Sequence, residues 1–503
     1  MLLYELYREA LQKNPEKTAI ICNEKTCTYK ELDERVKNFA LTLTDKGIKK
    51  GDRVALFMHN SIEIVELYFA CFRIGAIAVP ISVLYKKPEI IYAANHCQCK
   101  ILIAGKDDYA TVKDIKDSVP SLEKILAISS SWDEAVKEWH GEAEWPSLET
   151  DDPAVILYTS GSTDRPKGVT HTHSSLFNSA VNKSAAMEIE ESDMVILGTY
   201  LCHSSGLIGT AIPALYRGAT ILILTTSDPG IYLNLIEKYR VTHAITLPVQ
   251  LQELLDHPLS GKTDFTSIKY ILCGGDALTD HLRKLFFEVT GFELSEGFGA
   301  TECEGFMINP RRKAKRGSMG LPIPGTEVRL IDNKGNDVMK GETGEILVKS
   351  KALMAGYWND PENTEKSIID GWYHTGDLAR QDEDGYYYFA GRIKQMIVHC
   401  GGNMSPGEVE NAINEHPGVK VSGVAGIHDG VSGQSVIAFI VTNKSRDNLP
   451  DEKELKTFIS EKLSDYKVPE HWKFVDELPL NATGKIDRRK LNEMAEKYNS
   501  SLK

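Results

Sequence analysis

The sequence predicts a protein of mixed α/β and α+β class, and three observations support this prediction. Short apolar stretches alternate with amphipathic helices over roughly the first 300 residues, a rhythm typical of parallel sheets flanked by helices. Paired strand-like stretches joined by tight turns follow near residue 320, which indicates antiparallel structure. After Arg392 a fresh α+β pattern begins, so we expect a domain boundary near Lys394.

The N-terminal elements can be assigned from their start signals and apolar patterns. Thr28 and Glu31 form a capping box, because each side chain can satisfy the other's free backbone amide. Leu32, Val36 and Phe39 then fall on one face of the following helix. Helices are also expected near residues 62–72, 207–215, 232–239 and 250–255. Strands are expected at residues 54–58, 76–81, 154–159, 195–200, 219–224, 243–248 and 269–275.

The later elements change in character. Residues 327–332 and 344–350 read as paired antiparallel strands, and residues 382–392 contain an Asp-Gly turn. In the last part, Ser405 and Glu408 form a second apparent capping box, with Pro406 at the first helical position. Strands are expected at residues 421–427 and 435–442, followed by a helix near residues 454–463.

Composition narrows the class of protein. A chain of 503 residues exceeds what one hydrophobic core normally fills, so at least two domains are expected. The net charge of -13 argues against a nucleic-acid-binding protein, which needs clustered cationic surface. The N-terminus lacks the basic start and apolar run of a signal peptide, and no stretch is long enough to span a bilayer. We therefore expect a soluble cytoplasmic protein whose nine cysteines are mostly buried free thiols.

The stretch from Tyr158 to Val169, YTSGSTDRPKGV, has the composition of a loop that grips phosphates. Glycine lets the backbone approach closely, hydroxyls and amides donate hydrogen bonds, and Lys167 supplies the opposite charge. It is not a Walker P-loop, because Pro166 and Gly168 flank the lysine where that pattern requires Gly and Ser or Thr. From composition alone, a simple hydroxyl-rich surface turn remains an alternative.

Further clusters lie downstream of this loop. They are Cys273–Asp276 at a strand end, Phe298–Glu302, His374–Asp377, Gly391–Arg392 at the predicted domain break, and Thr483–Lys485 near the C-terminus. Together and in this order, YTSGSTxxPKG, FGATE, HTGD, GRIK and TGK resemble the adenylate-forming enzymes, namely acyl-CoA synthetases, adenylation domains of peptide synthetases and luciferases. The resemblance runs from about Thr28 to Leu491.

The resemblance implies a fold and a reaction. Residues 1–393 would form a large domain of αβαβα layers plus a distorted β-barrel, and residues 394–503 a small, mobile α+β lid domain. A carboxylate would attack the α-phosphate of MgATP to give an acyl-adenylate and pyrophosphate. The thiol of coenzyme A would then displace AMP. Because both reactants of the first step are anionic, such catalysis consists mainly of positioning and charge neutralisation.

The resemblance also implies residue roles. Lys485 would bridge the attacking carboxylate and the α-phosphate, Thr301 would bond the α-phosphate, and Glu302 would ligate Mg²⁺. Asp377 and Arg392 would bind the ribose. Lys394 would act as the hinge of the lid, with a loop that includes Gly401 and Gly402 lining the coenzyme A tunnel. The remaining nucleotide contacts would come from Thr159, Ser160, Gly161, Ser162, Thr163, Lys167, Gly274, Gly275, Asp276, Glu296, Gly297, Phe298 and Gly299.

The main departure from the family pattern is Asp164, which stands in the phosphate loop where the family has Gly; Ser162, His428 and Gln434 are smaller ones. An acidic side chain there predicts weaker ATP binding rather than inactivity.

By family position, the acyl pocket is bordered by His203, which could act in catalysis or simply pack in the core. The other expected lining residues are Tyr200, Ser204, Ser205, Gly206, Gly299, Ala300 and Cys303. The absence of Lys, Arg and Asp from these stretches favours a neutral fatty or aromatic acid.

Three functions remain open from the sequence. The leading one is an AMP-forming acyl-CoA synthetase, and the second is a free-standing enzyme that loads a phosphopantetheine carrier protein. The third, opposed by the intact motifs, is a catalytically silent nucleotide-binding homologue. A homodimer is also left open.

Overall fold

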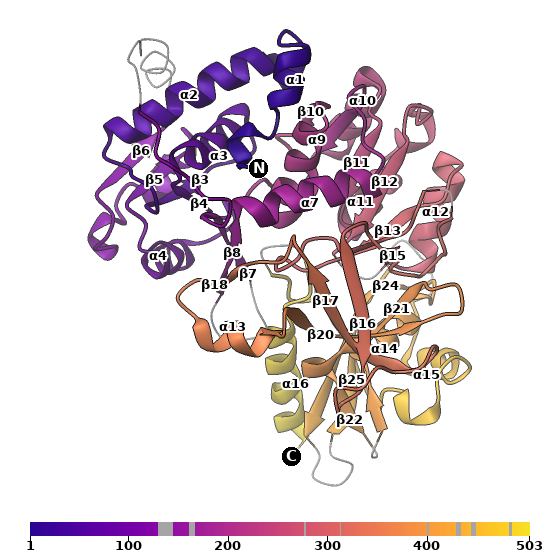
Figure 1. The fold of residues 1–503 in the computed structure, drawn as a ribbon. Helices are drawn as coiled ribbons and strands as arrows, with labels where there is room; N and C mark the ends of the chain where they lie inside the picture. Colours follow the sequence, from indigo (N-terminus) through magenta and orange to yellow (C-terminus); the bar gives the residue numbers. More distant parts are fainter. Residues whose placement is uncertain are drawn as a thin grey trace.

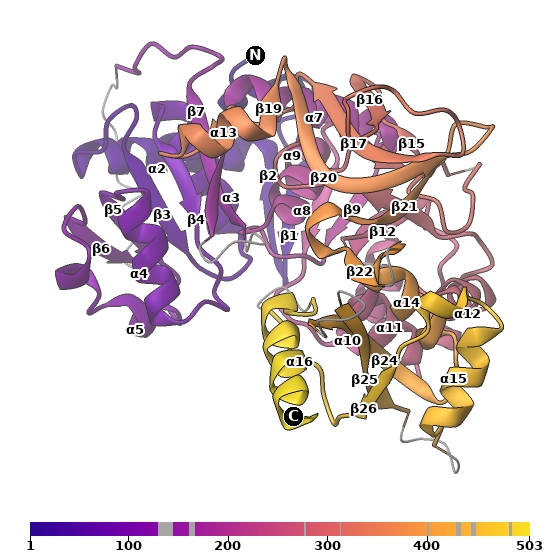
Figure 2. The same cartoon turned by 90° about the horizontal axis from the view of Figure 1, so that it is seen from below.

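The computed structural model describes residues 1–128, 144–159, 166–275, 278–311, 313–399, 402–428, 434–443, 449–481 and 485–502. In Figure 1 a large N-terminal part occupies the top and a smaller part, drawn in yellow and orange, lies below it. Figure 2, seen from below, shows the same small part beside the helices of the larger one. Among the described residues, no helix is long and apolar enough to cross a membrane.

The first large sheet has nine strands in the order β15-β14-β13-β12-β11-β9-β10-β1-β2. Its middle pairings, from β13 to β1, are parallel, and its outermost pairings are antiparallel. The strands are β1 (Thr18–Cys22), β2 (Lys25–Thr28), β9 (Met194–Leu197), β10 (Thr220–Ile223), β11 (His243–Thr246), β12 (Tyr270–Gly274), β13 (Ser295–Phe298), β14 (Met307–Ile308) and β15 (Leu321–Pro322).

The second large sheet has seven strands in the order β18-β8-β7-β4-β3-β5-β6. It is parallel except where β8 pairs with β7 and with β18. The strands are β3 (Arg53–Phe57), β4 (Ile77–Pro80), β5 (Ile101–Ala104), β6 (Lys124–Ala127), β7 (Pro153–Thr159), β8 (Lys167–Thr172) and β18 (Gly356–Tyr357).

Strand alternation places helices on both faces of each sheet. In β3, Val54 and Leu56 face the core between the two sheets, whereas Ala55 and Phe57 face the outer core. The central helices are α2 (Tyr29–Asp45), α3 (Ile62–Ile74), α7 (His173–Ala186) and α9 (Ile212–Tyr216). The outer helices are α4 (Lys87–His96) and α5 (Tyr109–Val112) on the seven-stranded sheet, and α10 (Pro229–Tyr239), α11 (Pro248–Asp256) and α12 (Asp280–Thr290) on the other. The order of layers is thus αβαβα.

The third sheet is antiparallel and curls into a half-barrel. It contains β16 (Thr326–Ile331), β17 (Thr343–Ser350), β19 (Ile368–Ile369), β20 (Trp372–Gln381) and β21 (Tyr387–Arg392), with α13 (Pro361–Ser367) before β19. The antiparallel strands predicted at residues 327–332, 344–350 and 382–392 are confirmed as β16, β17 and the β20–β21 hairpin.

The C-terminal part has its own three-stranded sheet with a core on each face. Helices α14 (Pro406–Asn414) and α15 (Glu452–Ser460) cover one face, and α16 (Arg488–Leu502) covers the other (Figure 2). The strands are β24 (Val419–His428), β25 (Gln434–Thr442) and β26 (His471–Phe474), and a small ribbon of β22 (Ile397–His399) and β23 (Gly402–Met404) precedes them.

The two predicted capping boxes have different outcomes. At α2 the box is confirmed, because Thr28 and Glu31 each accept a hydrogen bond from the other's backbone amide. At α14 the prediction is wrong, because the Ser405 side chain caps nothing. Glu408 instead pairs with Lys467 at 2.7 Å, so tertiary contact has taken the side chain that the box requires.

The N-terminal segment forms two short helices. Although Leu3, Tyr7 and Leu11 stand at helical spacing, the segment is divided into η1 (Leu3–Glu5) and α1 (Arg8–Lys13). The backbone amide of Leu3 donates to Nδ1 of His173 at 3.2 Å, and that tertiary contact anchors the first turn separately.

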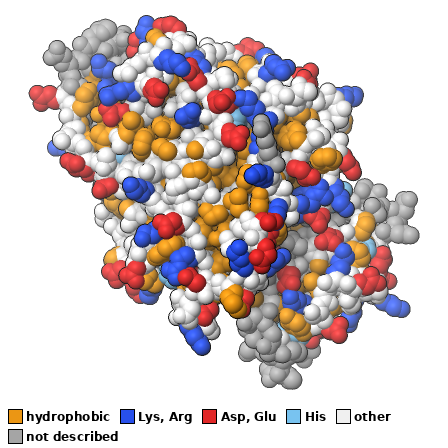
Figure 3. All heavy atoms as spheres, turned by 45° about the vertical axis from the view of Figure 1, so that its right-hand side comes forward, with side chains coloured by type: hydrophobic (Ala, Val, Ile, Leu, Met, Phe, Trp, Pro, Cys, Tyr) orange, Lys and Arg blue, Asp and Glu red, His pale blue; other side chains and the backbone are white. Residues whose placement is uncertain are grey.

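The surface carries mixed charge. Figure 3 shows acidic and basic side chains interspersed over one face, with hydrophobic side chains gathered between them near its middle. The described cysteines are all buried and free of disulfide bonds.

Candidate active site

The predicted phosphate loop connects two antiparallel strands. Thr159 at the end of β7 lies opposite Lys167 at the start of β8. A hairpin, rather than the strand-to-helix turn of a Walker motif, therefore presents this loop. Residues 160–165 lie outside the described residues, so the predictions for Ser160, Gly161, Ser162, Thr163 and Asp164 are not addressed by the structure.

Tyr357 links the lysine of this hairpin to the predicted metal ligand. Its backbone pairs with Val169 in β8, so β18 lies directly beside the phosphate hairpin. The Tyr357 hydroxyl donates to Oε1 of Glu302 at 2.8 Å, while the Lys167 ammonium lies 4.5 Å from the centre of the Tyr357 ring. Tyr357 thus contacts the Lys167 ammonium through its ring and the Glu302 carboxylate through its hydroxyl.

Partial burial lowers the pKa of Lys167, with Asp360 opposing this effect and the nearby Lys394 adding to it. An anionic ligand would restore the balance of charge around this lysine.

The segment that carries Thr301 and Glu302 is fixed through its backbone. The Met354 amide donates to the carbonyl of Glu302 at 2.8 Å. His171, buried in β8, lies 2.8 Å from the Thr301 carbonyl through Nε2 and 3.2 Å from the Ser175 hydroxyl through Nδ1. Burial lowers the pKa of His171 to about 4, so the ring is neutral at pH 7 and its Nε2–H can donate to the carbonyl. These bonds use the backbone carbonyls of Thr301 and Glu302 and not their side chains.

The expected adenine side is built from glycines on adjacent parallel strands. Gly274 in β12 lies opposite Gly297 in β13, and a Cβ on Gly274 would come within 2.5 Å of the Gly297 carbonyl oxygen. Gly275 has φ of 88°, a conformation that side chains disfavour. Phe298 packs against Phe306 and Phe389 at ring-centre separations of 5.6 and 5.7 Å. Asp276 lies outside the described residues.

Glu296, also expected near the nucleotide, has its carboxylate occupied by the protein. Arg283 donates to both oxygens at 2.9 and 2.8 Å, and the Gly317 amide donates to Oε1 at 3.1 Å. Any nucleotide contact at this position would come from its backbone.

Asp377 and Arg392 are direct cross-strand partners in β20 and β21. The Arg392 Nε donates to Oδ1 of Asp377 at 2.8 Å. Burial raises the pKa of Asp377, and the positive charges of Arg392 and Lys485 oppose that rise. Because Arg392 holds one oxygen, the other can accept hydrogen bonds from a polar ligand such as a diol.

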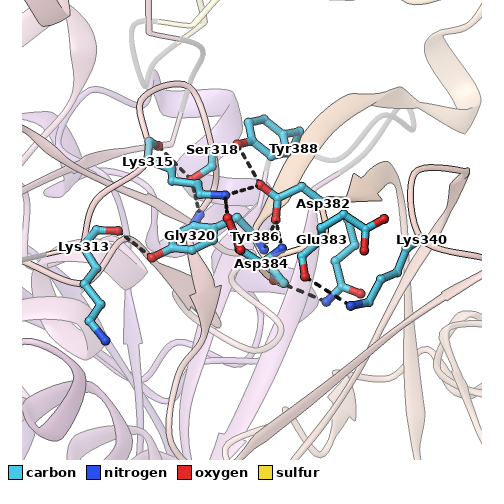
Figure 4. Close-up of polar contacts among 12 residues, drawn as sticks. Lys313, Lys315, Ser318, Gly320, Lys340, Asp382, Glu383, Asp384, Tyr386 and Tyr388 are labelled. Carbon is cyan, nitrogen blue, oxygen red and sulfur yellow. Dashed lines mark hydrogen bonds and ion pairs between the residues drawn. The ribbon is translucent and has the colours of Figure 1, made fainter.

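A polar network holds the hairpin that aligns this pair (Figure 4). The Asp382 carboxylate accepts hydrogen bonds from the backbone amides of Asp384 and Tyr386, and it pairs with Lys315 at 2.7 Å. The Tyr386 hydroxyl donates to the carbonyl of Lys313 at 2.5 Å. The turn is therefore fastened to the segment before β15, which fixes the register of β20 and β21.

Lys485 of the C-terminal part reaches the N-terminal site. Its Nζ lies 3.8 Å from the position that a Cβ on Gly275 would take. Its charge adds to the effect of burial in lowering the pKa of His203 to about 4, and it also opposes the raised pKa of Asp377. The lysine thus lies within electrostatic reach of the strand end, the histidine and the carboxylate.

His203 lies at the entrance to a helical segment and is neutral at pH 7. Its Nε2 atom is buried and has no hydrogen-bond partner within the described part of the chain. Buried polar atoms are nearly always bonded, so an open one beside a lysine indicates a place where a ligand completes the bonding.

The hinge and tunnel predictions are only partly addressed. Lys394 lies in η5 (Ile393–Gln395), close enough to Lys167 for the two charges to interact. Gly402 begins β23. Gly401 and Cys400 lie outside the described residues.

The site contains a fitting ligand for magnesium in Glu302. No group of three or more His, Cys, Asp or Glu side chains with metal-binding geometry occurs among the described residues. Mg²⁺ is commonly held by one or two carboxylates, with phosphate oxygens and water completing its octahedron. A single carboxylate beside a phosphate-binding hairpin matches this mode.

Sequence reasoning missed three residues that the tertiary structure brings to the site. Tyr357 and His171 belong to none of the recognised clusters, and only strand pairing places them beside Glu302 and Thr301. Lys183 of α7 is a buried lysine whose ammonium lies 4.0 Å from Glu304. The one available signal was that Lys183 is the only Lys, Arg, Asp or Glu in α7.

Comparisons with known proteins agree with this geometry. The family model described as AMP-binding enzyme matches residues 7–358, and that of the AMP-binding enzyme C-terminal domain matches residues 408–485. The chain is 33% identical over 481 residues to a feruloyl-CoA synthase of Amycolatopsis sp, covering 94% of this chain and 95% of that one. It is 31% identical over 496 residues to the fatty acid–[acyl-carrier-protein] ligase ScoC of Streptomyces coeruleorubidus, covering 96% and 94%.

A solved structure confirms the predicted fold class. The anthranilate CoA ligase AuaEII in complex with anthranoyl-AMP superposes with a TM-score of 0.92 at 28% identity, covering 99% of this chain and 98% of that one. The matched family models cover most of the sequence, and the order of layers, the half-barrel and the smaller C-terminal part agree with the family fold. The chain therefore belongs to the AMP-binding enzyme family, the adenylate-forming ligases.

Proposed function

We propose that this enzyme activates a fatty or aromatic carboxylic acid and transfers the acyl group to coenzyme A, using the residues described above. The adenylate-forming CoA ligases of this family use ATP, Mg²⁺ and coenzyme A. In the first step a carboxylate oxygen bonds to the α-phosphorus and the bond to pyrophosphate breaks. In the second, the thiol sulfur bonds to the acyl carbon and AMP leaves.

The main support for the proposed residue roles is the position of Lys485. It lies at the strand end occupied by Gly275, with the open Nε2 of His203 and the Asp377–Arg392 pair nearby. A carboxylate and an α-phosphate that met at this lysine would share one positive charge. Their mutual repulsion would fall as a result, because fixed charges in a site of low polarity act strongly and need no rearrangement.

The surrounding residues would divide the work of holding the reactants. Lys167 and the backbone of the hairpin would hold the terminal phosphates, Glu302 would supply a metal ligand, and Asp377 would accept hydrogen bonds from the ribose. Neutral His203 would bond to the reacting carboxylate without adding a competing charge. Tyr357 and His171 would keep Glu302 and Thr301 in place.

For the second step, Lys394 would serve as a hinge about which the C-terminal part rotates. Rotation would withdraw Lys485 and present the loop that contains Gly401 and Gly402 to the acyl-adenylate. This loop would line the tunnel through which the thiol enters.

Loading of a carrier protein is the second candidate, favoured by the relative that ligates fatty acids to an acyl-carrier protein. It uses the same residues through adenylate formation and differs only in the thiol acceptor.

Acid-dependent exchange of labelled pyrophosphate into ATP tests the proposal. We expect exchange with fatty or aromatic acids and, when coenzyme A is added, its stoichiometric consumption. Exchange without coenzyme A consumption would select the carrier-protein function, and no exchange with any acid would refute adenylate formation.

A further inference from the structure

A buried pair of opposite charges lies beyond the reacting centre. Lys183 projects from α7 with a side chain that is 3% exposed, and the Glu304 side chain is 11% exposed. Their nearest charged atoms are 4.0 Å apart, which exceeds the length of a hydrogen bond. The described residues give neither charged group a hydrogen bond, although such groups are rarely buried without one.

Three segments of backbone are shaped around this pair. A Cβ on Gly305 would lie 2.2 Å from the Lys183 ammonium, and a Cβ on Gly209 would lie 2.8 Å from Oε1 of Glu304. Glu304 itself has φ of 35°, an uncommon conformation for a residue with a side chain. Glycine at two positions and strain at a third keep space for these charges, which is typical of functional sites.

The helical segment from Ser204 to Tyr216 relates the pair to the catalytic lysine. It begins after His203 and contains a π-helical turn, η3 (Leu207–Ala211), where Pro213 cannot donate to the carbonyl four residues before it. Gly209 stands six positions after His203 in this segment. Glu304 therefore contacts, at Gly209, the same helical segment that His203 precedes.

The segment that follows β13 supports the same placement of Lys183 and Glu304. A Cβ on Gly299 would lie 2.5 Å from the Gly305 backbone, so the segment beside the expected adenine site runs directly to this pair. The charges thus lie between the helix that starts at His203 and the loop that follows Thr301 and Glu302.

We propose, on the basis of the ligase function above, that Lys183 and Glu304 form the distal wall of the acyl site. The pair selects an acid that carries a hydroxyl group at the end remote from its carboxylate. A hydroxyl accepts a hydrogen bond from the ammonium and donates one to the carboxylate, so it bridges a gap that the two charges leave open.

Other distal groups fit this wall less well. A second carboxylate would meet the like charge of Glu304, and an amine would meet that of Lys183. A methyl group would fill the space but satisfy neither charge, and a site built to bond a hydroxyl discriminates against analogues that lack it.

The test compares matched acids in pyrophosphate exchange. The probes are 4-hydroxycinnamate with cinnamate and 8-hydroxyoctanoate with octanoate, each pair differing by one distal hydroxyl. We expect the wild-type enzyme to show at least about tenfold higher kcat/KM for the hydroxylated member of a pair. In the double variant Lys183→Met, Glu304→Gln, which leaves no unpaired charge, we expect this ratio to fall close to one.

Lys269→Met is the matched control. It breaks the 2.8 Å pair between Lys269 and the buried Asp193. These two residues lie just before the first residues of β12 and β9, whereas Gly275 follows the opposite end of β12. Its kcat/KM ratio should remain that of the wild type, even if its thermal stability falls.

Each outcome decides the proposal. Two results would overturn the role of Lys183 and Glu304 and leave the ligase function standing. They are equal kcat/KM for the two acids of each pair in the wild type, and an unchanged kcat/KM ratio in the folded double variant. No exchange with any acid would overturn the ligase function and this inference together.

Discussion

Substitution of Tyr357 by phenylalanine removes one hydroxyl group and leaves the aromatic ring in place. The lost group donates to Oε1 of Glu302 at 2.8 Å, whereas the ring that faces Lys167 at 4.5 Å is retained. A hydrogen bond to a charged group contributes about 1.5–3 kcal/mol. We therefore expect the rate of adenylate formation to fall by about ten- to a hundredfold, because Glu302 is no longer held in one orientation.

The assay is pyrophosphate exchange measured as a function of Mg²⁺ concentration. If Tyr357 positions a metal ligand, the concentration of Mg²⁺ needed for half-maximal rate should rise. Tyr357→Leu should raise the activation free energy of adenylate formation by about 0.5–2 kcal/mol more than Tyr357→Phe does, because it also removes the contact between the ring and Lys167.

Tyr29→Phe is the control for loss of a buried hydroxyl. Tyr29 donates to the carbonyl of Ala219 at 2.7 Å, far from the site, and its loss should lower Tm without changing the Mg²⁺ dependence. A Tyr357→Phe enzyme with wild-type exchange at all Mg²⁺ concentrations would refute the proposed link between this tyrosine and Glu302.

Three further predictions concern other parts of the site. Lys485→Ala should abolish adenylate formation but spare thioester formation from a supplied acyl-adenylate, and equal loss of both half-reactions would contradict its role. Asp377→Asn should raise the KM for ATP about tenfold by weakening hydrogen bonds to the ribose, whereas an unchanged KM would place the ribose elsewhere. The neutral His171 should make the fold sensitive to acid. Its folded pKa of about 4 lies below the ordinary 6.5, so the unfolded chain binds the proton first. Stability should fall by about 3 kcal/mol as pH drops from 6.5 to 4, and His171→Gln should flatten the dependence of Tm on pH over this range.

Local signals predicted much of the fold. The strands around residues 54–58, 154–159 and 269–275 were recognisable because buried parallel strands are short apolar runs with turn residues at their ends. The capping box at Thr28 was correct because every group it requires lies within one turn. The same reasoning failed at Ser405, where Glu408 is used by Lys467, a residue 59 positions away.

The site was predictable to the extent that its residues form contiguous motifs. Thr301–Glu302, His374–Asp377 and Thr483–Lys485 could each be recognised as a cluster, and the family resemblance then implied their roles. Tyr357, His171 and Lys183 could not be recognised, because each acts through a partner distant in the chain. Tyr357 and Glu302 are 55 positions apart, and His171 and Thr301 are 130 apart.

The sequence by itself therefore determined the family, the fold class and the class of reaction, since those depend on local patterns and on motifs carried within single loops. The tertiary structure alone decided how Glu302 and Lys167 are held by one tyrosine and how Lys485 reaches a strand end of the other part. It also decided that the charged groups of Lys183 and Glu304 lie 4.0 Å apart. The physical reason is that register and packing bring remote residues within a few ångströms, and periodicity along the chain carries no record of such pairings.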